Sequence, residues 1–187
     1  MTSSARVGMV GAGQLARMTQ RAAIDLGVRL IVLAAHDDDP AVAAGAGAVA
    51  GAADDPDALA RLAADVDVLT LDHELVDRPA LAALEGRGVP VRPGTRALAV
   101  AQDKLLARET FAALGLPGPA HVVASDADGV AALGATHGWP LVAKARAGGY
   151  DGRGVALVDA DALARLLAGG GDWLVEQRVP IVTEVAV

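Results

Sequence analysis

The stretch RVGMVGAGQLARM, residues 6–18, decides the fold of the first half of the chain. Its valine-rich start predicts a buried strand over 6–10, and the remainder predicts a helix from about Gln14 to Leu26. Between them the sequence satisfies the pattern G-x-G-x-x-G/A in the required order of strand, turn and helix. The turn therefore offers the free N–H groups of a helix N-terminus, near Gln14 and Leu15, to a phosphate.

This motif alone fits a dinucleotide, a mononucleotide or a sugar phosphate. An acidic residue about twenty positions further on, at the end of the second strand, is typical of NAD-binding domains. Asp37 lies near that position, so an NAD(P)-dependent reductase stays open as an alternative.

Apolar runs and helical patterns alternate outward from this stretch and predict an α/β fold, a Rossmann-like parallel sheet with helices on both faces. Strands are expected at 29–34, 67–71 and 89–91, and helices after Pro40, at 56–64 and from Pro79 to Glu85. We place this Rossmann-like domain at residues 1–94 and linker helices at 95–118, which end in the breaker cluster GLPGP. Residues 119–187 are expected to form a small α+β subdomain and the start of a further domain.

In the later part, strands are expected at 120–123, 140–145, 154–158 and 173–177, and helices at 126–137 and 159–168. The last seven residues, IVTEVAV, predict another strand, which would leave an unpaired apolar edge. We therefore expect the sequence to be the front part of a longer protein, incomplete at its C-terminus.

Composition narrows the classes of function. The formal net charge of −7 argues against nonspecific binding to nucleic acid or to an anionic membrane surface. The absence of cysteine excludes disulfides, thiolate nucleophiles and Cys-ligated zinc. The 4 histidines show no metal-ligand spacing. Because no signal peptide is recognisable, a cytoplasmic soluble protein is expected.

Lysine and tyrosine are rare in this chain. Only two of its 16 basic residues are lysines, Lys104 and Lys144, and Tyr150 is its only tyrosine. A composition rich in Ala, Arg, Gly and Val is typical of a GC-rich genome, whose codons disfavour lysine and tyrosine. These three residues are therefore candidates for a chemical role.

A second glycine-rich loop joins two predicted strands in KARAGGYDGRGV, residues 144–155. Lys144 lies on the first strand, where its compact charge can reach a phosphate. The loop can close over a triphosphate through its backbone N–H groups, and Arg153 adds charge-assisted hydrogen bonds. A plain hairpin turn is the alternative, but it explains neither the length of the loop nor its tyrosine. It is not a Walker A loop, which needs G-K-[ST] before a helix.

A third element, WLVEQRVP at residues 173–180, is a strand that ends in an acceptor shortly before a proline. This arrangement resembles an adenine-binding connector. Glu184 follows it and could accept hydrogen bonds from ribose hydroxyls, although two exposed glutamates are the plain alternative.

Together these stretches resemble the ATP-grasp superfamily, and within it the N5-carboxyaminoimidazole ribonucleotide synthetases, which use bicarbonate in purine biosynthesis. The matching segments are GAGQLARM (11–18), DVLTLDHE (67–74), VRPGTRALAVAQDK (91–104), GGYDGRG (148–154) and VEQRVPIVTE (175–184). The family stretch T-x-E-x-E-N appears here as TLDHEL, residues 70–75, so Asp72 and Leu75 depart from it. Formate-dependent glycinamide ribonucleotide transformylase and biotin carboxylase fit these loops less well.

The resemblance implies that ATP phosphorylates bicarbonate to carboxyphosphate and that 5-aminoimidazole ribonucleotide then takes up the carboxyl group, with release of ADP and phosphate. It implies a PreATP-grasp domain followed by an ATP-grasp subdomain, a homodimeric full-length enzyme, and a front part that is inactive alone. Mg²⁺ ligands are expected beyond residue 187 and none in this chain. A transformylase-like ligase and a noncatalytic nucleotide-binding module remain alternatives.

The resemblance also assigns site residues. The ATP candidates are Lys104 and Lys144 on the phosphates, the loop Gly149, Tyr150, Asp151, Gly152, Arg153, Gly154 and Val155 over them, Glu176, Gln177, Arg178 and Val179 on adenine, and Glu184 on ribose. The substrate candidates are Gly13, Gln14 and Leu15 on the 5′-phosphate and Glu74, Tyr150, Asp151 and Arg153 around the imidazole ring and ribose. Asp151 and Arg153 are the catalytic candidates.

Overall fold

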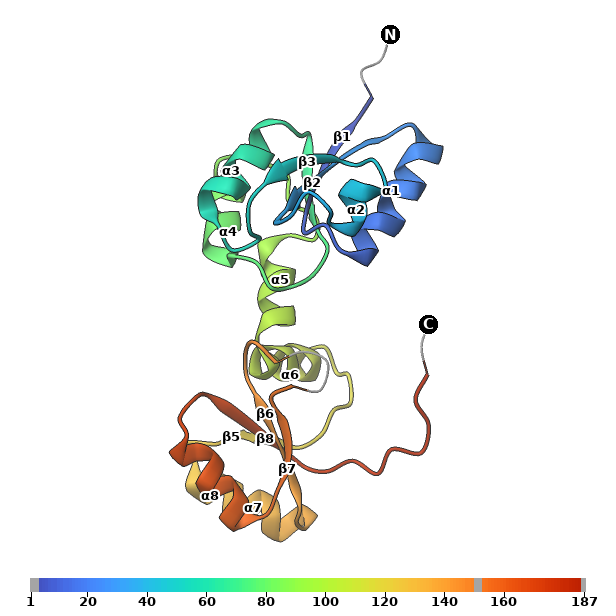
Figure 1. Cartoon of the computed structure of the whole chain (residues 1–187). Helices are drawn as coiled ribbons and strands as arrows, with labels where there is room; N and C mark the ends of the chain where they lie inside the picture. The colour runs from blue at the N-terminus through green and yellow to red at the C-terminus, as the bar shows by residue number, and fades with distance from the viewer. Residues whose placement is uncertain (1–3, 150–152, 186–187) are drawn as a thin grey trace. The chain divides into compact units, whose positions relative to one another are not determined.

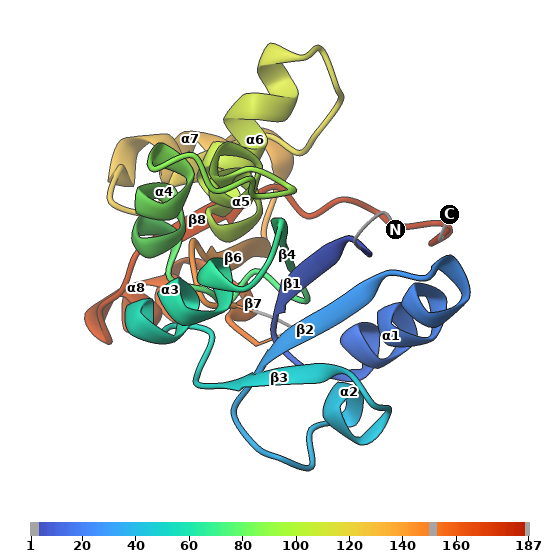
Figure 2. The same cartoon turned by 90° about the horizontal axis from the view of Figure 1, so that it is seen from above.

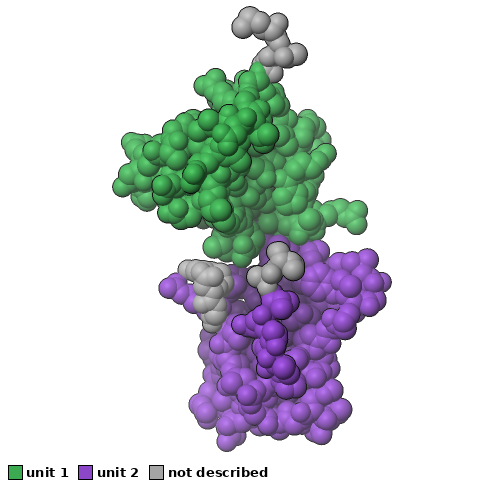
Figure 3. Space-filling view, turned by 90° about the vertical axis from the view of Figure 1, so that its right-hand side faces the viewer, with its two compact units in different colours: residues 1–99 green, residues 100–187 purple. Residues whose placement is uncertain are grey.

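The structure, a computed structural model, describes residues 4–149 and 153–185. The chain forms two compact units, Met1–Ala99 and Val100–Val187 (Figure 3). The first contains a parallel sheet and the second an antiparallel sheet, so the predicted α/β fold with a smaller α+β part is confirmed. Across the described residues, no helix is long and apolar enough to cross a membrane.

The first unit is built on a parallel sheet in the order β3-β2-β1-β4 (Figure 1). Its strands are β1 (Arg6–Val10), β2 (Arg29–Ala34), β3 (Gly47–Ala50) and β4 (Val68–Leu71). Its helices are α1 (Gln14–Leu26), α2 (Pro40–Ala43), α3 (Pro56–Ala64), α4 (Arg78–Gly86) and α5 (Thr95–Gln102), the last of which runs into the second unit.

Helices cover both faces of this sheet: α1 and α2 lie on one side, and α3 and α4 on the other (Figure 2). Because side chains alternate along a strand, neighbouring residues of β1 belong to different cores. Met9 packs in the cluster that contains Ala16 of α1, whereas Val10 packs in the cluster that contains Leu59 and Leu81. Both faces of the central strand are therefore buried, as in other doubly covered parallel sheets.

The structure departs from the expectations for the first part in two places. The edge strand β3 lies in a Gly/Ala-rich segment that carries no strand signal of its own, and it forms by pairing with β2. The expected strand 89–91 is only an isolated bridge between Val91 and Leu69, because Pro90 has no N–H to continue a ladder. Within the expected linker, 95–118, two helices form: α5 and a second helix that begins at Lys104 and is capped by the side chain of Asp103.

The second unit has an antiparallel sheet in the order β5-β8-β6-β7. Its strands are β5 (His121–Val123), β6 (Leu141–Ala145), β7 (Val155–Val158) and β8 (Trp173–Glu176), and its helices are α6 (Lys104–Ala113), α7 (Ala127–His137) and α8 (Ala160–Ala168). Helices α7 and α8 lie on one face of the sheet (Figure 1), where Leu133 and Leu163 pack on Leu141 and Val175. The side chains at the alternate positions of these strands, both polar and apolar, lie on the opposite face of the sheet.

The strand expected over the last seven residues, 181–187, is not present in its described part, 181–185. Val182 is 94% exposed and Val185 is 85% exposed. A segment rich in β-branched residues forms a strand only beside another strand, and no described residue forms a backbone hydrogen bond with this segment.

Candidate functional site

A cavity of about 1010 Å³ opens on the face of the second sheet that lies opposite α7 and α8. Three adjacent strands contribute alternate side chains to it: Val142 and Lys144 from β6, Val155 and Leu157 from β7, and Glu176 from β8. The remaining lining residues are Arg108 of α6, Pro119, and the segment 177–181 that follows β8. Because side chains alternate along each strand, helices cover one face of the sheet and the other face carries the cavity.

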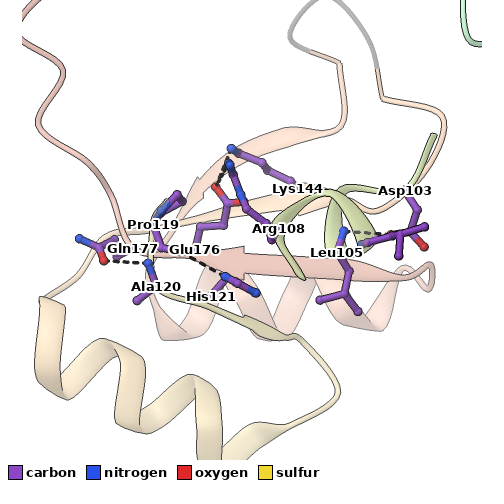
Figure 4. Close-up of polar contacts among 10 residues, drawn as sticks. Asp103, Leu105, Arg108, Pro119, Ala120, His121, Lys144, Glu176 and Gln177 are labelled. Carbon is purple, nitrogen blue, oxygen red and sulfur yellow. Dashed lines mark hydrogen bonds and ion pairs between the residues drawn. The ribbon is translucent and has the colours of Figure 1, made fainter. Parts of the chain in front are cut away.

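Glu176 is the central charge of this cavity, and its side chain is only 3% exposed. Its Oε1 accepts a hydrogen bond from Nε of Arg108 at 2.7 Å, and its Oε2 accepts one from Nη2 of Arg108 at 3.1 Å. Nζ of Lys144 also donates to Oε2, at 2.6 Å (Figure 4). Two cations thus share one carboxylate, so this three-residue cluster carries a net positive charge.

The pKa of Glu176 lies below its ordinary value. Burial alone would raise this pKa, but the hydrogen bonds from Arg108 and Lys144, together with their charges, outweigh that effect. Glu176 is therefore ionised at neutral pH, and a buried carboxylate of this kind holds both cations at the cavity.

Beyond β8 the backbone leaves the sheet. Gln177 is still attached to the start of β5, because its N–H donates to the carbonyl oxygen of Ala120 and its Oε1 accepts from the N–H of Ala120, both at 2.9 Å. In the described structure, residues 178–181 form no backbone–backbone hydrogen bonds. Their unpaired N–H and C=O groups lie beside apolar lining residues, which is the environment that the edge of a flat heteroaromatic ring needs.

The described arms of the glycine-rich loop approach each other closely. A Cβ added to Gly149 would lie 2.8 Å from the carbonyl oxygen of Arg153, and one added to Gly154 would lie 3.0 Å from Cβ of Ala145. Nζ of Lys104 donates to the carbonyl oxygen of Gly149 at 3.3 Å. Glycine is therefore required at the base of the loop, and Lys104 lies against this base. Tyr150, Asp151 and Gly152 lie outside the described residues.

Asp103 connects this loop to α6. Its Oδ1 accepts from the N–H groups of Leu105 and Leu106, which caps the helix, and its Oδ2 accepts from Nη2 of Arg146 at 2.6 Å. The hydrogen bond from Arg146 lowers the pKa of the Asp103 carboxyl. One carboxylate thereby fixes both the start of the helix that carries Arg108 and the beginning of the loop.

In the first unit, the glycine turn after β1 lies at the topological switch point of the sheet. The chain places β2 and β3 on one side of β1 and β4 on the other, and ligands of such sheets bind where the strand order reverses. Gly13 donates its N–H to Oδ2 of Asp72, which follows β4, at 2.9 Å. Gly13 provides no side-chain cap to α1, so the N–H groups of Gln14 and Leu15 begin the helix. Glu74 lies two residues beyond Asp72.

Replacing Gly11 with alanine is expected to destabilise the first unit by about 2 kcal/mol. Gly11 has φ +102°, a conformation that a side chain disfavours, and the added Cβ would lie 2.8 Å from Cβ of Asp72. Chemical denaturation measures the change. Gly86→Ala is the matched control, because nothing lies within 4 Å of its added Cβ. Equal stabilities of the two variants would contradict the close approach of this turn to Asp72.

The structure brings most of the sequence candidates of the second unit together. Lys144, Val155 and the four residues 176–179 line the cavity, and Lys104 contacts the glycine-rich loop at Gly149. Glu184 lies in the exposed segment beyond Ile181 and does not line the cavity. Arg108 was missed. Its signal was its spacing of four residues from Lys104 on a predicted helix, which places both cations on one face.

Two domain families match this chain. Residues 4–102 match the ribonucleotide synthetase preATP-grasp domain, and residues 109–187 match the ATP-grasp domain. Among curated proteins, the N5-carboxyaminoimidazole ribonucleotide synthase of Mycobacterium tuberculosis is 46% identical over 96% of this chain and 43% of that protein. The synthase of Synechococcus elongatus is 41% identical over 97% of this chain and 47% of that protein. The chain therefore spans less than half the length of these relatives.

Solved structures of enzymes with the same name also match this chain. The Staphylococcus aureus N5-carboxyaminoimidazole synthetase complexed with ADP matches with a TM-score of 0.84 and 26% identity, over 95% of this chain and 48% of that chain. The Aspergillus clavatus synthase, in complex with ADP and 5-aminoimidazole ribonucleotide, matches with a TM-score of 0.82 and 28% identity, over 96% and 48%. The chain belongs to the ribonucleotide synthetase preATP-grasp family, with an ATP-grasp domain after the preATP-grasp domain, and it is similar to the N5-carboxyaminoimidazole ribonucleotide synthases.

Proposed function

We propose that the chain is part of an ATP-dependent ligase that carboxylates 5-aminoimidazole ribonucleotide with bicarbonate and releases ADP and phosphate. The observation that carries this proposal is the cavity of the second unit, where a net positive cluster at Lys144 lies beside unpaired backbone after β8. Phosphates need the charge, and a purine edge needs the backbone groups. Relatives that match nearly the whole chain carry this enzyme name.

Within the cavity, residues 176–179 would receive adenine through their backbone groups, and Lys144 would contact the phosphates. Lys104 and the loop from Gly149 to Val155 would cover the phosphates, and Glu184 would reach the ribose. Catalysis of this kind consists mainly of holding the reactants in place and stabilising charge on the transferred phosphoryl group. Asp151 and Arg153 are the proposed catalytic residues, acting with Tyr150 on the ribonucleotide side of the loop.

The ribonucleotide phosphate is proposed to bind at the start of α1. The N–H groups of Gln14 and Leu15 and the partial positive charge of the helix N-terminus suit an anion, and Gly13 lets the chain turn into the helix. Glu74 accepts hydrogen bonds without donating any, which suits an amine or sugar hydroxyls. We also propose a homodimeric, cytoplasmic full-length enzyme in which residues 1–94, 95–118 and 119–187 form the first domain, the linker and the ATP-grasp start.

Mg²⁺ is the expected companion of ATP in such a ligase. Searched over the described residues, no group of three or more His, Cys, Asp or Glu side chains could hold a metal ion. We propose that the protein ligands of this Mg²⁺ lie beyond residue 187.

Two other functions remain weaker. A glycinamide transformylase of Mycobacterium tuberculosis matches with a TM-score of 0.70 at 22% identity, which shows a shared fold only. An NAD(P)-dependent reductase would explain the first glycine turn, but it leaves the ATP-grasp match over residues 109–187 unexplained.

The natural full-length protein is expected to release ADP from ATP when bicarbonate and 5-aminoimidazole ribonucleotide are both present, and far more slowly when either is omitted. The assay couples ADP release to NADH oxidation, with formate and glycinamide ribonucleotide as the alternative substrate pair. ADP release that depends on the formate pair would favour the transformylase. Tight binding of NADH without binding of ATP would favour the reductase.

A further inference from the structure

We propose that Arg108 is a positioning residue that keeps Glu176 paired when Lys144 turns to the nucleotide phosphates. This inference rests on the proposed function, because it requires a phosphate-bearing nucleotide in the cavity. It concerns a residue of α6 that is remote in sequence from both of its partners.

The two cations contact Glu176 unequally. The Arg108 guanidinium reaches both carboxylate oxygens, at 2.7 and 3.1 Å, which is a two-point ion pair of fixed geometry. Lys144 contacts one oxygen only, at 2.6 Å. If Lys144 moves away, the pair of Arg108 and Glu176 remains complete. If Arg108 were absent, Lys144 would be the only cation at the carboxylate.

Burial makes that difference important. The Glu176 side chain is 3% exposed, so little water reaches it, and an unpaired buried carboxylate is strongly unfavourable. Lys144 is 23% exposed and lies at the cavity surface, where an ammonium with three donors can turn toward a phosphate. Without Arg108, the phosphate and Glu176 would compete for the same ammonium group.

The other groups near the carboxylate do not take over this role. Arg178 lines the cavity but is exposed, and it forms no hydrogen bond or ion pair with a described residue. Nδ1 of His121, on the neighbouring strand β5, contacts the carbonyl oxygen of Pro119 at 3.1 Å. In the described part of the chain, Arg108 and Lys144 are therefore the two cations paired with Glu176.

The test compares ADP with adenosine, which lacks phosphates, by calorimetric titration of the natural full-length protein. Arg108→Met is expected to weaken ADP binding by about tenfold and to leave adenosine binding within about twofold, because only the phosphates need Lys144. Arg108→Lys should recover part of the loss. Arg165→Met, an exposed arginine of α8 outside the cavity, controls for the loss of one positive charge.

A double variant separates positioning from a direct contact. In Arg108→Met with Glu176→Met, nothing competes for Lys144, so ADP affinity is expected to return toward the wild-type value. Denaturation curves establish that each variant is folded. No recovery in the double variant would mean that Arg108 contacts the phosphates itself and would overturn the proposal. Equal losses for ADP and adenosine, or no loss in Arg108→Met, would overturn it as well. If the wild-type protein binds neither ligand, the proposed function fails first.

Discussion

Glu176→Gln is expected to lower the free energy of unfolding of the second unit by about 3 kcal/mol at neutral pH. The substitution removes the single negative charge that Arg108 and Lys144 share, while keeping the size of the side chain. The two cations then repel each other at the surface of a cavity that is lined partly by apolar side chains. Because both are about a quarter exposed, at 26% and 23%, water screens part of this repulsion, so we expect the lower end of the range for buried pairs.

The effect should depend on pH in a specific direction. The pKa of Glu176 is lowered by folding from its ordinary value of 4.5, so its ionised form contributes stability that is complete above 4.5 and is lost as the pH falls through the folded-state value. The difference between the wild type and Glu176→Gln should therefore shrink in acid. Urea denaturation followed by the fluorescence of Trp139 and Trp173 measures it, with exposed Glu109→Gln as the control. A difference that does not change with pH would contradict the ion-pair account.

Local signals predicted the helices of this chain well. The helix expected at 56–64 is α3, which follows Asp55 and begins at Pro56. Asp55 caps it by accepting hydrogen bonds from the N–H groups of Asp57 and Ala58. Such caps act within one turn, so a short window of sequence contains all the information that is needed.

Strands were predicted less well where their stability comes from a distant partner. Residues 47–50 carry no β-branched run, yet they form β3 because β2 presents an edge to them. Residues 181–185, IVTEV, are rich in β-branched side chains, yet they form no strand. A pattern in one segment does not tell which other segment lies beside it.

The site shows the same limit. Lys144 and Glu176 were each predicted as nucleotide ligands, but their direct ion pair was not, because it depends on the register of β6 and β8. That register pairs Val142 with Glu176 and Lys144 with Leu174, so the lysine and the glutamate are diagonal neighbours on one face. Arg108 completes the cluster from α6. Its spacing from Lys104 indicates that the two cations share a helix face, but its pairing with Glu176 depends on tertiary packing.

Lys144→Met is expected to weaken ADP binding by about 10- to 100-fold, or about 1.5–3 kcal/mol, the contribution of a hydrogen bond to a charged group. Methionine keeps the length and the apolar stem of lysine on β6, so the strand should still pack. The stability of the second unit should change less than in Glu176→Gln, because Glu176 retains both contacts with Arg108. Calorimetric titration of the full-length protein gives the affinity, and urea denaturation gives the stability.

Adenosine serves as the matched ligand for this variant, since it occupies the purine site without phosphates. Its affinity for Lys144→Met should stay close to that for the wild type. A parallel loss of adenosine and ADP binding would show that the substitution distorts the cavity, and an unchanged ADP affinity would show that Lys144 does not reach the phosphates. The two variants differ in the charge that they leave at the cavity. Lys144→Met leaves a neutral pair of Arg108 and Glu176, so ADP binding should fall. Glu176→Gln leaves two cations, so ADP binding should hold or strengthen.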